Sequence, residues 1–329
     1  MSLLVVMAHF DVARILRDHT LRTIENYAAA ADRVVVISTS GIRPEDHERL
    51  PAKVEFVTRP NFGYDFFSYK WGLDLVGDYG AYDRVVISND TFIGPVLPLA
   101  TILESDRAHE CDIMGMTWSE NHGGHAQSFF VTVSGRAARA NAFQHFWRDM
   151  TPISDRTKVI LSYEVGMTTA ITDSGFTAGG YLVPTEQEEQ LARERFRHMY
   201  SVRLKANGGT TVRGVHPSWT EDHYRSYNPA IALSDRLLMY ARLPLLKFDT
   251  LRFDPYGLGA RDLLDAVEKA YPVETQGVRA FLRETRADYP FRPGEHNILP
   301  DPAALAESGL GYCMDAGFLT QEPKNDGVS

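Results

Sequence analysis

The sequence predicts an α/β protein whose core is a mostly parallel sheet flanked by helices. Short apolar runs without polar alternation recur through the first half of the chain, and such runs are typical of strands buried on both faces of a parallel sheet. Helical segments separate these runs, as expected of a doubly wound, Rossmann-like sheet. Polar clusters follow four of the runs. Because ligands of such sheets bind beyond the carboxyl ends of the strands, these clusters mark a candidate site.

The apolar runs and helical patterns define the expected elements in chain order. Strands are expected at residues 3–7, 34–37, 54–57, 84–88, 113–118 and 128–133. Helices are expected at residues 21–31, 64–75, 99–105, 136–150, 159–173 and 185–205. Segments 119–127 and 208–227, which are polar and contain glycines, are expected to be loops.

The same patterns predict how the chain divides. We expect one α/β domain at residues 1–205 and a mainly helical C-terminal extension, packed on that domain, at residues 206–318. Residues 319–329 are polar and are expected to be a disordered tail.

Composition and charge narrow the class of partner. Acidic residues outnumber basic ones by 43 to 34, and the net charge of −9 argues against nucleic acid as the main partner. No stretch approaches the roughly 18 apolar residues that a membrane helix needs, and the N-terminal apolar run lacks a basic leader, so we expect a cytoplasmic protein. Cys111 and Cys313 lack metal-ligand spacing and are expected to be buried free thiols. The oligomeric state stays open.

Several familiar catalytic signatures are missing from the sequence. It contains no phosphate-binding loop of the GxxxxGK[ST] type, no GxSxG nucleophile elbow and no complete GxGxxG, since Gly257 and Gly259 lack the third glycine. Ordinary NTPase, serine hydrolase and dinucleotide-binding functions therefore lose support.

Four polar clusters are expected to meet at one edge of the sheet. Turn and cap chemistry is the alternative for each cluster taken singly, because Ser, Asn, Asp and Gly favour such positions. Convergence at a single edge favours a ligand site instead. The clusters are His9-Phe10-Asp11, Ser38-Thr39-Ser40-Gly41, Asn61-Phe62-Gly63-Tyr64-Asp65 and Asn89-Asp90-Thr91.

Two acids in these clusters have specific chemistry. Asp90 follows directly on an apolar strand, where a carboxylate could hold a divalent cation against a diphosphate, or could cap the next turn. Asp65 stands at the start of a predicted helix, just after Gly63, whose lack of a side chain permits close backbone approach. Asp65 could cap that helix or accept hydrogen bonds from sugar hydroxyls.

An ordered set of motifs lies between residues 5 and 254. The motifs are NFGYDFFSYKWGL, VISNDTFIGP, HAQSFF, FQHFW, YEVGMT and a later series of NP followed by LPLLK. This set resembles the rhamnan synthesis protein F (RgpF-like) glycosyltransferase family. The resemblance implies a GT-A-like nucleotide-binding core that transfers a sugar, commonly rhamnose from dTDP-rhamnose, to a saccharide or lipid-linked glycan. This activity would serve bacterial surface polysaccharide synthesis at the inner face of the plasma membrane. Transfer of another hexose such as galactofuranose, or binding of carbohydrate or nucleotide without turnover, are the alternatives.

The resemblance also implies roles for the strand-end residues. The Asn89-Asp90-Thr91 segment stands where a GT-A enzyme carries its DxD element, but it has a single acid, so dependence on Mg²⁺ or Mn²⁺ stays open. Asp90 is the expected metal ligand. Contacts to the nucleotide-sugar donor are expected from His9, Phe10, Ser38, Thr39, Asn61, Gly63, Asp65, Asn89, Asp90 and Lys247.

Glu164 is expected to be the general base of a single-displacement, inverting transfer. It lies early in a predicted helix among apolar neighbours, where partial burial would raise its pKa and the helix N-terminus would lower it. A solvated or salt-bridged Glu is the alternative, and His125 is the second candidate base. Contacts to the acceptor sugar are expected from His125, Gln127, Ser128 and Tyr163.

Two further groups of residues could bind ligands. Glu120, His122 and His125 are close in sequence, but two glycines between the histidines favour a flexible loop over a zinc site. Lys247 and Arg252 match the last family motif, and a cation there could meet the donor diphosphate or the phosphates of a lipid-linked acceptor. A structural role for these cations is equally open.

Overall fold

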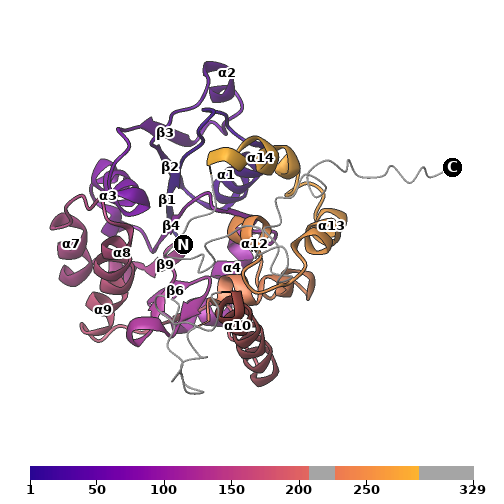
Figure 1. The fold of residues 1–329 in the computed structure, drawn as a ribbon. Helices are drawn as coiled ribbons and strands as arrows, with labels where there is room; N and C mark the ends of the chain where they lie inside the picture. The colour runs from indigo at the N-terminus through magenta and orange to yellow at the C-terminus, as the bar shows by residue number, and fades with distance from the viewer. Residues whose placement is uncertain (207–226, 289–329) are drawn as a thin grey trace.

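A computed structural model describes residues 1–206 and 227–288, and Figure 1 shows their arrangement around one central sheet. The sheet has seven strands in the order β10-β6-β9-β4-β1-β2-β3. Neighbours among β1 to β4 are parallel, as are β10 and β6, whereas β9 runs antiparallel to both β4 and β6. The predicted mostly parallel sheet is confirmed. Its strands are β1 (Leu3–His9), β2 (Arg33–Ser38), β3 (Val54–Thr58), β4 (Arg84–Ser88), β6 (Ile113–Gly115), β9 (Phe130–Ser134) and β10 (Ala178–Gly180).

Helices cover both faces of the sheet, which explains why its central strands are apolar throughout (Figure 1). Along β1, Val5 and Met7 pack into the core cluster beneath helix α1, whereas Leu4 and Val6 pack into the cluster beneath helix α3. Gly72 lets α3 approach the sheet, because a Cβ atom there would lie 2.4 Å from Cγ1 of Val6. The covering helices are α1 (Asp18–Ala30) and α4 (Leu99–Leu103) on one face, and α3 (Tyr64–Val76), α7 (Asn141–Arg148) and α9 (Gly166–Thr172) on the other.

The region between β6 and α7 differs from the sequence prediction. Strand β6 ends at Gly115, and a separate antiparallel hairpin of β7 (Trp118–Ser119) and β8 (His125–Ala126) occupies the expected loop. The expected helix 136–150 is divided into α6 (Gly135–Ala138) and α7, because Ala140 between them has extended backbone with ψ of 140°. Short helices not expected from the sequence are α2 (Pro44–His47) and α5 (Asp106–Glu110), with 3₁₀ turns at Tyr79–Ala81, Asn121–Gly123, Ser234–Leu238 and Arg286–Asp288.

The helical segment that carries Glu164 begins earlier than expected. It runs from α8 (Arg156–Val159) through a π-helical stretch at Ile160–Val165 into α9. The carboxylate of Asp155 accepts a hydrogen bond of 2.8 Å from the backbone N–H of Lys158 and so caps α8. Glu164 therefore lies in the middle of the segment, and the expectation that it sits near a helix N-terminus is wrong.

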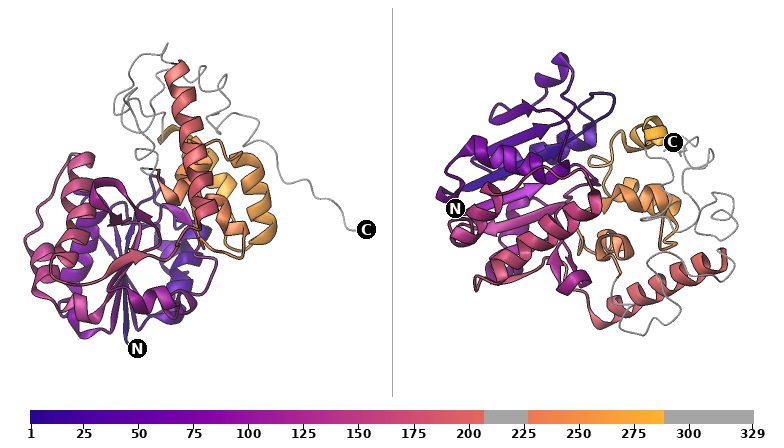
Figure 2. Two further views of the ribbon diagram at one scale, coloured as in Figure 1. Left: turned by 90° about the horizontal axis from the view of Figure 1, so that it is seen from below. Right: turned by 60° about the vertical axis from the view of Figure 1, so that its left-hand side comes forward.

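The described part of the C-terminal extension is mainly helical, as predicted, and packs on the core. Its strand β11 (Leu246–Lys247) pairs antiparallel with β5 (Phe92–Ile93), which follows β4 in the core. Gly94 makes this approach possible, since a Cβ atom there would lie 2.7 Å from the carbonyl oxygen of Pro244. Figure 2 shows α10 (Glu186–Ala206) as a long helix beside the extension. The remaining helices are α11 (Pro229–Ala232), α12 (Phe248–Phe253), α13 (Ala260–Ala270) and α14 (Val278–Glu284).

Three sequence expectations concern the rest of the chain. Cys111 is a buried free thiol, as expected, whereas Cys313 lies outside the described residues. Most of the expected loop 208–227 and the whole expected tail also lie outside them. Within residues 1–206 and 227–288, no helix is both long and apolar enough to cross a membrane.

Candidate active site

Polar side chains from four strand ends meet at the carboxyl edge of the sheet, as predicted. The backbone N–H of Phe10, after β1, donates to Oδ2 of Asp90, after β4, over 2.8 Å. Nδ1 of His9 lies 2.9 Å from Oγ of Ser38 at the end of β2. The side-chain amide of Asn89 donates to Oδ2 of Asp65, at the start of α3, over 2.8 Å. The edge is therefore one connected polar surface.

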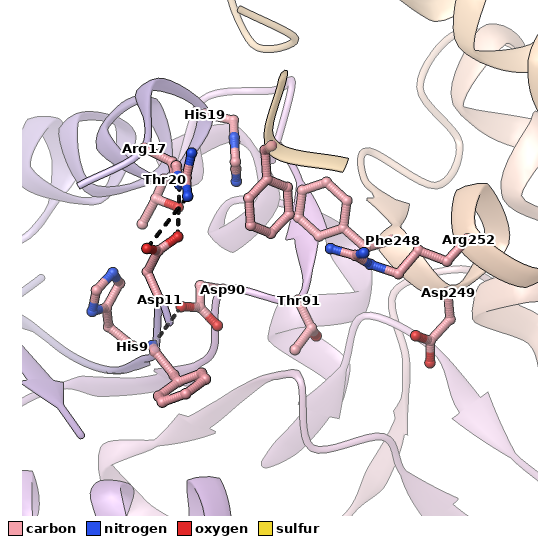
Figure 3. Close-up of a pocket in the computed structure, with 12 residues that line it drawn as sticks. His9, Asp11, Arg17, His19, Thr20, Asp90, Thr91, Phe248, Asp249 and Arg252 are labelled. Carbon is pink, nitrogen blue, oxygen red and sulfur yellow. Dashed lines mark hydrogen bonds and ion pairs between the residues drawn. The ribbon is translucent and has the colours of Figure 1, made fainter. Parts of the chain in front are cut away.

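Two cavities open along this edge. The larger has a volume of about 360 Å³, at the lower end of the range of roughly 300–1,000 Å³ that is typical of small-molecule sites. The smaller, of about 50 Å³, lies between the ends of β1 and β4 and helices α12 and α14, and Figure 3 shows its lining. The cavities are adjacent, because Thr91 and Asp249 line both.

The side chain of Asn89 makes the hydrogen bonds of the turn after β4. Its Oδ1 accepts hydrogen bonds from the backbone N–H and the hydroxyl of Thr91, over 3.2 and 2.7 Å. Helix α3 is preceded by Gly63, so its N-cap position carries no side chain. Asp65 lies in the first turn and accepts from Asn89. Asp65 therefore does not cap α3, and Asp90 accepts from Phe10 instead of capping the turn after β4.

The surroundings of Asp65 and Asp90 disfavour ionisation and raise the pKa of both. Burial raises the pKa of Asp90 to about 7, and the nearby carboxylates of Asp65 and Asp11 raise it further, against the hydrogen bond from Phe10. Burial also raises the pKa of Asp65, while the Asn89 amide and the Lys247 ammonium act in the opposite direction. A cation placed at Asp90 would relieve this repulsion.

A divalent cation at Asp90 would have few ligands from the described part of the protein. Among the described residues there is no group of three or more His, Cys, Asp or Glu side chains that could hold a metal ion. Mg²⁺ is commonly bound by only one or two carboxylates together with substrate phosphates and water. The Asp90 carboxylate, raised in pKa by burial and by neighbouring acids, suits that pattern.

Lys247 reaches the larger cavity from the C-terminal extension. The β5–β11 pairing places it opposite Phe92, and its ammonium donates to the hydroxyl of Thr91 and lies 4.4 Å from the ring centre of Phe129. Burial lowers the pKa of Lys247, while the carboxylates of Asp249 and Asp65 raise it. The amine of Lys247 thus faces the cavity beside the acids.

Glu164 lines the same cavity and is held at both carboxylate oxygens. Oε2 accepts from the backbone N–H of Ser128 over 2.8 Å and from the Ser128 hydroxyl, and Oε1 lies 3.3 Å from Nε2 of His125. Burial alone would raise its pKa, but the His125 and Ser128 interactions outweigh burial and lower it. The sequence left the net direction of this pKa open, because the partners that decide it, His125 and Ser128, come from another segment.

His125 supports Glu164 from behind the cavity. It is 3 % exposed, and its Nδ1 lies 3.1 Å from the carbonyl oxygen of Asn121, so this nitrogen is the donor. His122 is exposed and has a left-handed backbone with φ of 55°. The β7–β8 hairpin thus directs His125 to Glu164 rather than to a metal site with Glu120 and His122.

The comparison with known families agrees with the sequence motifs. The profile of the family described as "Rhamnan synthesis protein F" matches residues 34–207, more than half of the chain. The chain belongs to this family.

Two curated relatives share part of the sequence. An uncharacterized protein, y4gN, of Sinorhizobium fredii is 24% identical over 161 residues, which cover 46% of this chain and 42% of the relative. Virulence protein VirA of Vibrio anguillarum is 30% identical over 139 residues, which cover 41% of this chain and 44% of the relative. The chain therefore spans less than half the length of these relatives.

Two solved structures are distantly similar. The galactosyltransferase LgtC in complex with donor and acceptor sugar analogues matches with a TM-score of 0.39 and 10% identity over 82% of this chain and 96% of that one. S. aureus TarS matches with a TM-score of 0.33 and 10% identity over 95% of this chain and 55% of that one. Both TM-scores are low, so these likenesses add nothing to what the strand order of the sheet shows.

In this member of the rhamnan synthesis protein F family, the predicted site residues fall into three groups. Those that line the larger cavity are Asp65, Asn89, Gln127, Ser128, Glu164 and Lys247. Those that line the smaller cavity are His9, Phe10 and Asp90. Those outside the described lining of both are Ser38, Thr39, Asn61, Gly63, His125 and Tyr163.

Tyr163, Ser38 and Thr39, of the third group, are hydrogen-bonded to other parts of the protein. The hydroxyl of Tyr163 is hydrogen-bonded to the backbone of Thr151. Ser38 Oγ accepts from the backbone N–H of Gly41 over 2.9 Å and contacts His9. The backbone N–H of Thr39 donates to the carbonyl oxygen of His9 over 3.0 Å.

Asn61 and Gly63 also lie away from the described lining. Asn61 is exposed, and Gly63 has a positive φ of 72°. A Cβ atom at Gly63 would lie 2.7 Å from Cβ of Phe67, so this position needs a glycine at the start of α3.

Sequence reasoning missed two charged residues of the larger cavity. Arg156 lies in the first turn of α8, at a position expected to be outside the helix. Asp249 lines both cavities, and its position two residues after Lys247 in the last family motif was the available signal. Arg156 adds a basic side chain and Asp249 an acidic one to the lining of the larger cavity.

Proposed function

We propose that this chain is a GT-A-like glycosyltransferase that moves a sugar from a nucleotide-activated donor to a saccharide or lipid-linked glycan in polysaccharide synthesis. The observation that carries the proposal is that Asp65, Glu164 and Lys247 line one cavity at the carboxyl edge of the sheet. A carboxylate base and a buried cation in one cavity are the groups that sugar transfer from a diphosphate requires. Membership of the rhamnan synthesis protein F family supports the same function.

Each charged group has a role that its surroundings support. Lys247, with Arg156 in the same lining, would stabilise the negative charge that develops on the departing diphosphate. Asp65 opens on the same cavity and would accept hydrogen bonds from hydroxyls of the donor sugar. A divalent cation bound with Asp90 would neutralise charge on the diphosphate.

The transfer is proposed to be a single displacement with inversion. Glu164 accepts the proton of an acceptor hydroxyl while the oxygen attacks the anomeric carbon, and the bond from that carbon to the phosphate oxygen breaks. The nucleoside diphosphate leaves with the bonding electron pair. Because the pKa of Glu164 is lowered, this carboxylate is ionised at neutral pH, as a proton acceptor must be, but it is a weaker base than an ordinary Glu. His125 and Ser128 keep it oriented.

The donor is proposed to carry rhamnose, and dTDP-rhamnose is the first donor to test. The family description supports this sugar. Hexose donors, including galactofuranose, are the alternatives, and binding without turnover is the alternative to catalysis.

Release of free nucleoside diphosphate tests the function directly. The chain is incubated with dTDP-rhamnose, UDP-galactofuranose or UDP-galactose, each with and without Mn²⁺ and a panel of saccharide acceptors, with the Glu164→Gln variant as control. A thermal-shift titration with each donor runs in parallel, because a ligand that binds only the native state raises the unfolding midpoint. Acceptor-dependent release that disappears in the variant supports transfer. A thermal shift without any release indicates a binding module.

A further inference from the structure

A third cavity of about 110 Å³ lies between the β7–β8 hairpin and the first half of α10. We call it the hairpin cavity. Trp118 and Glu120 line it from the hairpin side, and Glu189 and Arg193 line it from α10. Pro184 and Tyr227 complete the described lining.

The hairpin cavity is next to the larger cavity of the candidate active site. Tyr227 lines the hairpin cavity, and the following residue, Asn228, lines the larger one. On the hairpin, the hydroxyl of Thr117, the neighbour of Trp118, donates to Oε1 of Gln127 over 2.7 Å. Gln127 lines the larger cavity. Two stretches of chain thus connect the two linings, so one extended ligand could contact both.

Two hydrogen-bonding groups in the hairpin cavity have no partner within residues 1–206 and 227–288. Tyr227 is 8% exposed, and within the described residues its hydroxyl makes no hydrogen bond. Nε of Arg193 is buried and also has no partner there, while its Nη2 donates to Oε2 of Glu189 over 2.8 Å. Burial raises the pKa of Tyr227 to about 12, so its hydroxyl keeps its proton and can donate. Unpaired buried donors are costly unless a ligand meets them.

The chemistry of the lining selects for a neutral ligand rich in hydroxyls. Carboxylates such as Glu120 and Glu189 only accept hydrogen bonds and the Arg193 guanidinium only donates, whereas a sugar hydroxyl does both. The two carboxylates would repel a phosphate group.

Trp118 adds an apolar surface that suits the C–H face of a sugar ring. The backbone of Gly124 packs against this indole, since a Cβ atom there would lie 2.7 Å from Cζ2 of Trp118. The ring is thereby held in place.

We propose that the hairpin cavity is a saccharide subsite that binds a second sugar residue of the acceptor glycan. The proposal rests on the proposed function, because the sugar that it holds belongs to the acceptor of the transfer. The hairpin cavity, at about 110 Å³, has room for several water molecules of about 30 Å³ each, so the edge of a sugar ring could replace solvent there. The transferase would then recognise acceptors by more than the sugar that is modified.

The test compares Trp118→Ala with Trp71→Ala. Trp71 is a matched control, because it is 38% exposed on α3 and lies outside the described lining of the three cavities. Rhamnose and an α-linked rhamnose trisaccharide, with the corresponding galactose saccharides, are titrated against each protein by calorimetry. We expect a trisaccharide to bind the wild type and Trp71→Ala equally, and Trp118→Ala about tenfold more weakly, as the loss of one aromatic contact implies.

Further measurements separate the possible failures. Glu189→Gln removes a carboxylate without opening the lining and should also weaken the trisaccharide, which guards against misfolding of Trp118→Ala. Thermal shifts with nucleoside diphosphate should be equal in all the proteins. Equal trisaccharide binding by Trp118→Ala and Trp71→Ala, or no saccharide binding by the wild type, overturns the subsite. If nucleoside diphosphate is still released with an acceptor, the proposed function survives that result.

Discussion

The imidazole of His125 and the carboxylate of Glu164 form a close pair, with Nε2 lying 3.3 Å from Oε1. Ser128 donates to the other carboxylate oxygen through its backbone N–H and its hydroxyl. A carboxylate offers about four lone-pair positions, so the two Ser128 donors and the His125 contact leave at least one for an acceptor hydroxyl. The pair is therefore compatible with a base that is oriented by its neighbours and still faces the cavity.

Glu164→Gln should reduce turnover by roughly 10²–10⁴-fold while leaving donor affinity unchanged, because it keeps the shape of the side chain but removes the proton acceptor. Steady-state kinetics give the turnover, and thermal shift with nucleoside diphosphate gives the affinity. Loss of donor binding would make Glu164 a ligand or folding residue. Near-normal turnover would move the role of base to Asp65, which opens on the same cavity.

Asp90→Asn should weaken binding of the nucleoside diphosphate when Mg²⁺ or Mn²⁺ is present and should have no such effect with chelator. The carboxylate acts through the cation, and without the cation it repels phosphate. Titrations with and without EDTA measure the difference. The same loss of affinity in both conditions would mark Asp90 as a structural residue or a direct sugar ligand.

The same substitution should stabilise the ligand-free protein at alkaline pH. The pKa of Asp90 is raised from 3.8 to about 7 in the folded state, so its ionisation costs stability that is lost as the pH rises from 3.8 to about 7; the cost is full above pH 7 and absent below pH 3.8. Asn keeps an acceptor for the N–H of Phe10 but carries no charge. We expect a gain of roughly 2–4 kcal/mol at pH 8 and little change at pH 4. Denaturant unfolding at both pH values measures it, and an equal effect at both would refute the raised pKa.

Local patterns were sufficient to predict six of the seven strands of the sheet, but not β10 or the surroundings of the site. Apolar runs located the strands at Leu3–His9 and Arg33–Ser38 because burial on both faces leaves a continuous signature in sequence. The position of Lys247 came from the family motif, because its contact to Thr91 joins residues 156 positions apart. The lowered pKa of Glu164 could not be foreseen, since Ser128 lies 36 residues away.

Lys247→Ala should weaken binding of the nucleoside diphosphate about 10- to 100-fold, the usual effect of removing a charged hydrogen bond of roughly 1.5–3 kcal/mol. The substitution also removes the cation that offsets the negative charges of Asp65 and Asp249, so these carboxylates repel phosphate more strongly. Lys269→Ala, an exposed position on α13, is the control and should bind normally. If both variants bind alike, Lys247 has only a structural role in the β5–β11 pairing.

His125→Gln should move the acid limb of the turnover profile to higher pH without abolishing turnover at pH 7. His125 is the leading hydrogen-bonding cause of the lowered pKa of Glu164, so removing it makes the carboxylate hold a proton more tightly. In the wild type the acid limb should lie below pH 4.5, the ordinary value for this carboxyl, and in the variant it should rise. His122→Gln, at an exposed position of the same hairpin, should leave the profile unchanged. If His125 is itself the base, His125→Gln will instead lose turnover at every pH, because no group remains to accept the proton.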